Sequence, residues 1–278
     1  MKTTMKTTAT VLILSVLAAC GTTYDVPEVS QSSVATARAM FAAERQPDAI
    51  NRPRLGAAAA VDQFARVVAR LEPVAEDFCR SQTADRPDFD CDINIVVDRQ
   101  MPVRNAYQTY GPNGEIIVAL SVPMIADARN ADEMAFVIAH EVGHHVGRHI
   151  EKAGQQALAG ALIMGALTAY GQASATAANP YRYTGGDQAQ MRDAVRAGAM
   201  VGDMAYSQTY ELEADVIGTY IAASAGYDPV VGARFFARPE AARTPQGSRS
   251  FWGTHPPNEA RLATVIQTAE AIASAVGR

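Results

Sequence analysis

The sequence His-Glu-Val-Gly-His at residues 140–144 lies in an apolar stretch with helical spacing, and it determines how the rest of the chain is interpreted. Residues four positions apart lie on one side of an α-helix, so His140 and His144 can both reach a single metal ion. Glu141 lies about 100° around that helix, close enough to contact a metal-bound water without binding the metal. The pattern therefore predicts two zinc ligands and the base that activates the water.

The distribution of histidines supports this interpretation. The chain has five histidines, of which four lie at positions 140, 144, 145 and 149, and the fifth is His255. A helix that carries several surface histidines for no particular purpose is the alternative. The clustering favours metal binding over that alternative.

Composition limits the size and the partners of the protein. A chain of 278 residues with 48% hydrophobic content can bury one substantial core. The net charge of −5 comes from 24 basic and 29 acidic residues, and no basic run is present. Nucleic acid is therefore not an expected partner.

The N-terminus has the features of a secretory segment. Lys2 and Lys6 provide positive charge, residues 9–19 are uncharged and largely apolar, and small residues precede Cys20. We expect residues 1–19 to be a signal peptide. Residues 17–20, Leu-Ala-Ala-Cys, also resemble a bacterial lipobox, which implies lipid attachment at Cys20. An ordinary secretory signal with an incidental cysteine is the alternative.

The lipobox resemblance carries an expectation about location. Gly21, rather than an aspartate, follows the cysteine, which by resemblance favours sorting to the outer membrane. We therefore expect a protein held by lipid on the periplasmic face of the bacterial outer membrane. In that oxidising compartment Cys79 and Cys91 form an even pair around a polar loop, and we predict a disulfide between them. Two buried thiols are the alternative.

Hydrophobic periodicity gives a coarse map of the chain before the metal motif. Residues 20–54 are polar and rich in proline, and we interpret them as a lipidated, partly ordered tether. The next segments predict an amphipathic helix that Pro73 bends or ends, a strand, a turn and a second strand. These elements are expected at residues 61–71, 93–97, 111–114 and 115–120 respectively.

The metal motif and the segments after it are predicted to be mainly helical. Asn130 followed by Glu133 is a capping pair that opens a helix through about residue 152. Residues 154–172 are small and apolar, and the uncharged part is too short to cross a membrane, so we expect a buried or lid-like helix. Residues 173–187 predict a mobile loop, and another helix follows to about residue 207.

A catalytic zinc needs a third protein ligand and an open position. A third histidine six residues after His144 would complete one common arrangement, but that position holds Ile150. The alternative source is the sequence Glu-Leu-Glu-Ala-Asp at residues 211–215, within a helical segment to about residue 224. From the residues alone, Glu211 and Glu213 both remain candidates.

Here the chain resembles the M48 family of metallopeptidases, whose second motif is Glu-x-x-Ala-Asp. That register implies Glu211 as the third zinc ligand and Asp215 as the group that orients a ligand histidine. The resemblance extends from about residue 91 to 261. It includes Asn-Ala-Tyr at 105–107, which matches a segment before the family's edge strand, and Thr-His-Pro-Pro at 254–257 followed by Arg261.

The resemblance implies an α+β fold, in which a mainly helical, zincin-like metallopeptidase domain of residues 55–278 holds a small β-sheet beside the 140–144 helix. It also implies one Zn²⁺ per chain and places His255 and Arg261 at the rim of the active site, where they would stabilise the oxyanion. For His255 two alternatives stay open: a structural histidine at the Pro-Pro turn, or an inhibitory fourth zinc ligand.

The expected function is zinc-dependent cleavage of unfolded or misassembled envelope polypeptides. The resemblance places the substrate-binding strand at residues 115–120, and a peptide would add to its exposed edge through main-chain hydrogen bonds. Residues 154–187 are hypothesised to cover the cleft. The rivals are a zinc-containing periplasmic chaperone that binds without efficient cleavage, and a structural lipoprotein whose motif is a relic.

Overall fold

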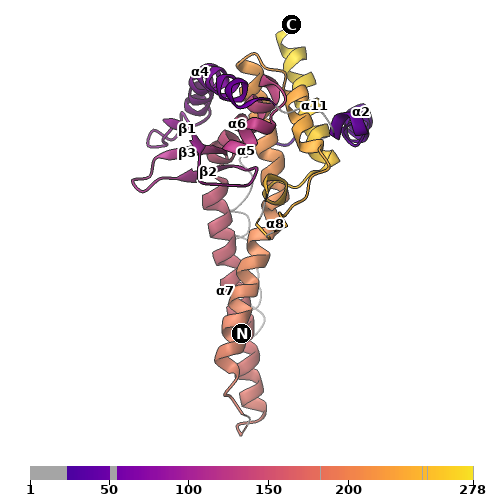
Figure 1. Ribbon diagram of the computed structural model, residues 1–278. Helices are drawn as coiled ribbons and strands as arrows, with labels where there is room; N and C mark the ends of the chain where they lie inside the picture. Colours follow the sequence, from indigo (N-terminus) through magenta and orange to yellow (C-terminus); the bar gives the residue numbers. More distant parts are fainter. Residues whose placement is uncertain (1–23, 51–54, 182, 246, 249, 278) are drawn as a thin grey trace. The chain divides into compact units, whose positions relative to one another are not determined.

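Residues 24–50, 55–181, 183–245, 247–248 and 250–277 are described by the computed structural model of the protein, which Figure 1 shows. The predicted signal peptide and Cys20 lie outside these residues. The chain divides into two units. Unit 1 comprises Arg148–Tyr210 among the described residues, and unit 2 comprises Tyr24–Gly147 and Glu211–Arg278.

The described elements are helices, apart from three strands. In chain order they are α2 (Gln31–Glu44), α3 (Pro47–Ile50), α4 (Ala57–Gln82), β1 (Ile93–Asp98), β2 (Ala106–Tyr110), β3 (Ile116–Ser121), α5 (Val122–Asp127), α6 (Ala131–Val146), α7 (His149–Ala178), α8 (Asp187–Ser224), α9 (Pro229–Ala233), the 3-10 helix η1 (Arg234–Ala237), α10 (Phe251–Thr254) and α11 (Glu259–Val276). This content confirms the expected α+β class.

The three strands form one mixed sheet with the order β1-β3-β2. β3 pairs in parallel with β1 and antiparallel with β2. The expectation that residues 115–120 form an exposed edge strand is therefore wrong, because β3 is central. The edge strands are β1 and β2, and β2 begins inside the Asn-Ala-Tyr segment that was expected to precede an edge strand.

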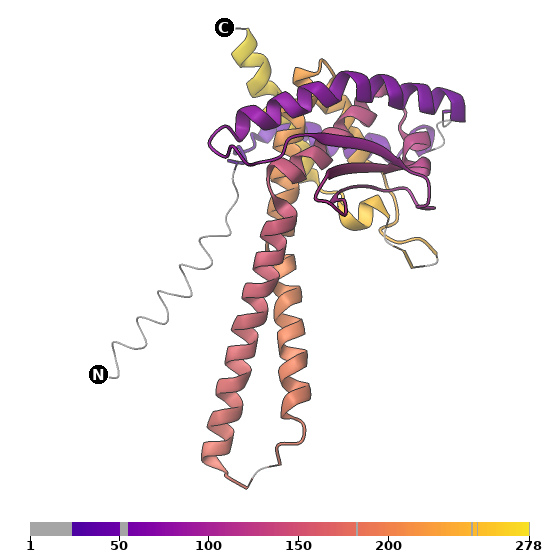
Figure 2. The ribbon, with the colours of Figure 1, turned by 90° about the vertical axis from the view of Figure 1, so that its left-hand side faces the viewer.

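Helices cover one side of the sheet and build the core of unit 2. α6 packs against β2 and β3, and α4 packs against β1 and α6. Figure 2 shows α4 running along the sheet. Pro73 lies inside α4, which continues to Gln82 and so is longer than the periodicity predicted. Cys79 at its end forms a disulfide with Cys91, across a Cα–Cα distance of 5.8 Å, as the sequence predicted.

The N-terminal segment is more ordered than the expected tether. α2 packs against α11, and its side chains Ala37 and Phe41 lie in the core. Glu44 at its end is fully buried and forms ion pairs with Arg129 and Arg234, at 2.6 and 3.1 Å. Buried carboxylates need such partners, and these cannot form unless α2 is docked. From Tyr24 onward this segment is therefore part of unit 2.

The helix that was expected at residues 130–152 is in fact two helices. α6 ends at Val146, and Arg148 has a φ of 57°, the left-handed conformation that ends a helix. α7 then begins at His149 and belongs to unit 1. The helix that was predicted to end at about residue 207 and the helical segment predicted at residues 211–224 are one helix, because α8 runs without a break from Asp187 to Ser224.

Unit 1 is a hairpin of α7 and the first part of α8, which lie side by side in Figures 1 and 2. Its connection is shorter than the predicted loop at 173–187, because α7 continues to Ala178. Of the two alternatives for residues 154–172, the buried helix is wrong, because of the described α7 side chains only His149 and Gln156 are buried. The lid-like helix stays a prediction. Among the described residues, none of the helices is long and apolar enough to cross a membrane.

Candidate metal centre

Helix α6 supplies two ligand histidines from within the core. Its N-terminus is capped by Asn130, whose side chain accepts a hydrogen bond of 2.8 Å from the backbone N–H of Glu133. His140 is fully buried, and its Nε2 atom lies 3.1 Å from Nε2 of His144. The one-turn separation therefore brings both ring nitrogens to one point, as the sequence predicted.

Buried ion pairs hold the start of α6. Glu133 accepts from the backbone N–H of Arg129 at 2.7 Å and pairs with Arg238, which is itself buried. Arg238 also contacts Asp127 at 2.8 Å, and Arg104 contacts the same carboxylate at 3.0 Å. Each buried charge thus has a partner, which fixes the helix that carries the histidines.

Helix α8 brings the second motif against α6 at very short backbone separation. A methyl group at Gly143 would lie 2.8 Å from the carbonyl oxygen of Ala214, and one at Gly218 would lie 3.0 Å from the backbone nitrogen of His140. The two helices can therefore cross this closely only because both positions are glycine. The crossing places Glu211 beside the histidines.

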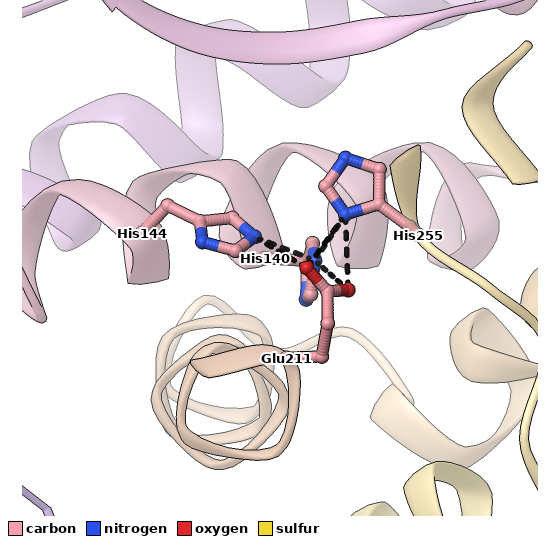
Figure 3. A group of neighbouring side chains, drawn as sticks. All are labelled: His140, His144, Glu211 and His255. Carbon is pink, nitrogen blue, oxygen red and sulfur yellow. Dashed lines mark hydrogen bonds and ion pairs between the residues drawn. The ribbon is translucent and has the colours of Figure 1, made fainter. Parts of the chain in front are cut away.

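The donor atoms of four residues converge in one place. His140, His144, Glu211 and His255 each offer one atom, and these atoms all lie within 4.8 Å of one another (Figure 3). Glu211 Oε2 lies 3.5 Å from His140 Nε2, and Oε1 lies 3.4 Å from His144 Nε2. Ligand atoms about 2.0–2.1 Å from one zinc ion lie about 3.3 Å apart at tetrahedral angles. The spacing therefore fits a zinc ion.

Asp215 has the position that an orienting group needs. Its Oδ1 atom lies 2.9 Å from Nδ1 of His140. A hydrogen bond from Nδ1 to this carboxylate leaves the lone pair on Nε2, which faces the other donors. The predicted role of Asp215 thus has a geometry that can support it.

Arg261 lies in the interior, not at the rim where the resemblance implied it. Its Nε and Nη2 atoms donate to Asp215 at 2.7 and 2.8 Å, and its Nη1 atom lies 2.9 Å from Glu211 Oε2. Its guanidinium also stacks over the ring of Phe236 at 4.3 Å. With these contacts Arg261 can hold both carboxylates in place.

The local charges keep the acidic groups ionised. Burial alone would raise the pKa of Glu211, but the charges of His255 and Arg261 outweigh burial and hold this pKa well below its ordinary value. The pKa of Asp215 is also lowered, because Arg261 outweighs the effect of burial. Both carboxylates are therefore negative at neutral pH, as cation binding requires.

His255 lies among the donor atoms. Its Nδ1 atom is 3.0 Å from Glu211 Oε2 and 3.2 Å from His140 Nε2, while its Nε2 atom is 3.3 Å from Glu141 Oε1. Its ring packs on Phe251, with centroids 4.6 Å apart. In this arrangement His255 has the position of a fourth ligand, and Glu141 lies next to it.

The remaining histidines have other partners. His145 Nε2 lies 2.8 Å from the carbonyl oxygen of Asp90, and its ring contacts Phe89. His149 stacks on Tyr210 within unit 1, with centroids 4.6 Å apart. Half of the histidine cluster at 140–149 is therefore structural, which the count alone did not indicate.

Sequence reasoning missed two contributors to the site. Gly143 was not recognised as the contact point with α8, although a glycine inside a helical pattern is a signal of close backbone approach. Phe236 was also missed; its ring lies 5.2 Å from that of His140. No sequence signal distinguishes this phenylalanine from the other aromatic residues of the core.

Two histidines on one helix, a carboxylate ligand from a second helix and a glutamate base beside them define a metallopeptidase of the His-Glu-x-x-His class. The model of peptidase family M48 matches residues 63–269. The chain therefore belongs to peptidase family M48. A comparison with curated proteins gave no match.

Proposed function

We propose that this protein is a zinc-dependent endopeptidase that cleaves unfolded or misassembled polypeptides in the periplasm. The observation that carries the proposal is the convergence of His140, His144 and Glu211 with Glu141 beside them. A protein that only bound zinc would have no need of Glu141, which is neither a ligand nor the group that orients one. The choice of zinc rests on the donor set of two imidazoles and one carboxylate.

In the proposed mechanism each residue has one task. His140, His144 and Glu211 would hold the zinc ion, which when bound lowers the pKa of water towards about 7 and polarises a carbonyl group. Glu141 accepts the proton of the attacking water and passes it to the leaving amine. Asp215 and Arg261 hold His140 and Glu211 in position through the contacts described above.

His255 is proposed to act as a removable fourth ligand. Substrate hydrolysis needs an open position on the metal, and Nδ1 of His255 lies among the donor atoms that would fill it. His255 would therefore have to leave this position before the protein could cleave a substrate. Stabilisation of the oxyanion by the displaced ring is compatible with this role.

Substrate is proposed to bind as an added strand on β2. β2 and β3 pair antiparallel, and two backbone hydrogen bonds fix which residues of β2 bond to β3. The N–H of Ser121 donates to the carbonyl oxygen of Asn105, and the N–H of Gly111 donates to that of Glu115. The odd-numbered residues of β2 therefore form the hydrogen bonds with β3. Ala106 and Gln108 therefore direct their backbone groups away from β3. Ala106 is fully buried and Gln108 is 9% exposed, so an extended peptide would pair with this edge at Gln108. Such pairing uses main-chain groups and requires an unpaired stretch of substrate.

The periplasmic setting is supported by the N-terminal sequence and by the cysteines. The Leu-Ala-Ala-Cys segment supports lipid attachment at Cys20 and location at the outer membrane. The disulfide between Cys79 and Cys91 suits an oxidising compartment. Selection of unfolded substrates at that location would make the protein part of envelope protein quality control.

The test is cleavage of unfolded casein by the zinc-loaded chain of residues 21–278, which lacks the lipidated cysteine. We expect cleavage that is lost on chelation and falls by about 10²–10⁴ in Glu141→Gln. Glu270→Gln, an exposed glutamate on α11, is the matched control and should cleave normally. Binding of casein without cleavage, with zinc bound, would instead support the chaperone alternative.

A further inference from the structure

Helix α7 in unit 1 has an unusual outer surface. From residue 153 to 181 the sequence contains no Asp, Glu, Lys or Arg. Leu158, Leu162 and Leu167 are 62, 65 and 60% exposed. A helix with leucines on its outer side and no charge is normally buried against another apolar surface. This helix therefore lacks a covering layer among the described residues.

The other helix of the hairpin covers only one side of α7. Gly198 of α8 faces the carbonyl oxygen of Gly160 and the side chain of Met164, and Gly165 faces Val195. The exposed leucines do not belong to this contact. Three tyrosines near the end of α7 and in the connection are also exposed: Tyr170, Tyr181 and Tyr183 are 76, 97 and 89% exposed.

The two helices of the hairpin differ in the charged residues that they expose. α8 presents Arg192, Asp193 and Arg196 to solvent, whereas α7 has no charged group after Lys152. A water-soluble protein partner would meet some charge on a surface of this length. Hydrocarbon on one side, water on the other, and phenol rings at the level of the headgroups would match this distribution.

We propose that the uncharged outer side of α7, which carries Leu158, Leu162, Leu167 and Tyr170, rests on a phospholipid surface. The contact is peripheral, in keeping with the finding that no described helix can cross a membrane. It goes beyond the proposed peptidase activity but draws on the proposed lipid at Cys20. Because Cys20 lies four residues before Tyr24, at most about 14 Å of chain separates a lipid there from unit 2.

The combination of the two contacts has a physical purpose. A diacylated cysteine would already be a stable anchor, so a second membrane contact would restrict how the protein moves on the surface rather than supply the attachment. The hairpin is covalently joined to unit 2 at Gly147 and Glu211, so its contact with lipid acts on the same molecule that Cys20 holds. The proposed lipid at Cys20 would keep this molecule close to a bilayer. For this reason we favour a lipid surface over other apolar partners.

The test measures vesicle binding without the lipid anchor. The chain of residues 21–278, which lacks Cys20 and so carries no acyl group, is mixed with phosphatidylcholine vesicles and separated by flotation. We expect it to float with the vesicles, and the triple variant Leu158→Gln, Leu162→Gln, Leu167→Gln to bind at least tenfold less. The triple variant Val61→Gln, Val122→Gln, Val276→Gln changes exposed apolar residues outside the hairpin and should bind normally.

Three results would overturn the proposal. One is no flotation of the unmodified chain; another is binding that requires anionic lipid, which would indicate an electrostatic contact. The third is a dimer without lipid that the leucine variant converts to monomer, since a second copy would then cover the face. Circular dichroism checks that both triple variants are folded. Acylation of Cys20 is measured separately by mass spectrometry, so failure of the anchor is distinguishable from failure of the hairpin contact.

Discussion

The side chain of His255 controls the one coordination position that substrate needs. If the bound and open arrangements exchange, with the open one populated at 10% or less, removal of the ring frees the position in every molecule. We expect His255→Ala to cleave an unfolded peptide at least tenfold faster at saturating zinc, while binding zinc more weakly. The measurement is kcat/KM beside zinc content. A loss of about 10²–10³ would contradict this expectation and identify His255 as an essential oxyanion donor.

At this same scale, the residues of the site differ in how well the sequence predicts them. His140, His144 and Glu141 follow from helical spacing, which is a local property. Glu211 required the family resemblance, because Glu213 was an equal candidate from the residues alone. The interior position of Arg261 could not be predicted, since its contacts with Asp215 and Glu211 arise from residues 46 and 50 positions away that only the fold brings together.

Among the elements, the crossing of α6 and α8 depends on the absence of a side chain at Gly143. A methyl group there would lie 2.8 Å from the carbonyl oxygen of Ala214 and would push the helices apart. We expect Gly143→Ala to lower the free energy of unfolding by about 1–3 kcal/mol and to weaken zinc binding. Denaturant unfolding and zinc titration measure the two effects.

Gly154→Ala on α7 is the matched control, because no atom lies within 4 Å of the added methyl group. Replacement of a helical glycine by alanine at an open position stabilises a helix by about 1 kcal/mol. The two substitutions should therefore have opposite signs. Equal effects would show that helix propensity, not the crossing, governs Gly143.

The strand β2 gives a second prediction for an element. Proline is tolerated on the free side of an edge strand, where it removes only an N–H that the sheet does not use. We expect Gln108→Pro to raise KM for an extended substrate about tenfold, because one main-chain hydrogen bond is lost. Gln108→Ala, which keeps the N–H, should change KM much less. Similar KM values in the two variants would argue against substrate addition at β2.

The order of the strands was also the least predictable part of the fold. Periodicity identified β1 and β3, but alternation along one strand carries no information on which strand is its neighbour. The end of α6 has a clearer signal in the sequence, because Gly147 is a residue at which helices commonly end. The apolar spacing nevertheless continues to Ile150, and it suggested one longer helix. In α7 the small apolar residues predicted helix correctly and burial incorrectly, because composition does not reveal what covers a surface.

For the whole molecule, the metal should contribute to global stability. A ligand present at 1,000 times its Kd adds about 4 kcal/mol to the free energy of unfolding. For a domain of this size we expect chelation to lower Tm by about 10 °C, measured by scanning calorimetry, with recovery on addition of zinc. In a His140→Ala, His144→Ala variant the chelator should have no effect. An unchanged Tm in the unmodified protein would mean that the site holds no metal.

The packing of α2 against α11 has a consequence for the order of events during synthesis. The backbone N–H of Ser30 donates to the side chain of Gln267, 237 residues later, and Arg38 pairs with Glu259. His255 and Arg261 also enter the site from this late part of the chain. A nascent chain that has not yet been made as far as Arg261 therefore lacks both α11 and a complete set of donors. Proteolytic competence arises only once these late residues have been made and have folded, so the earlier, unfolded part of the chain never lies beside a finished active site.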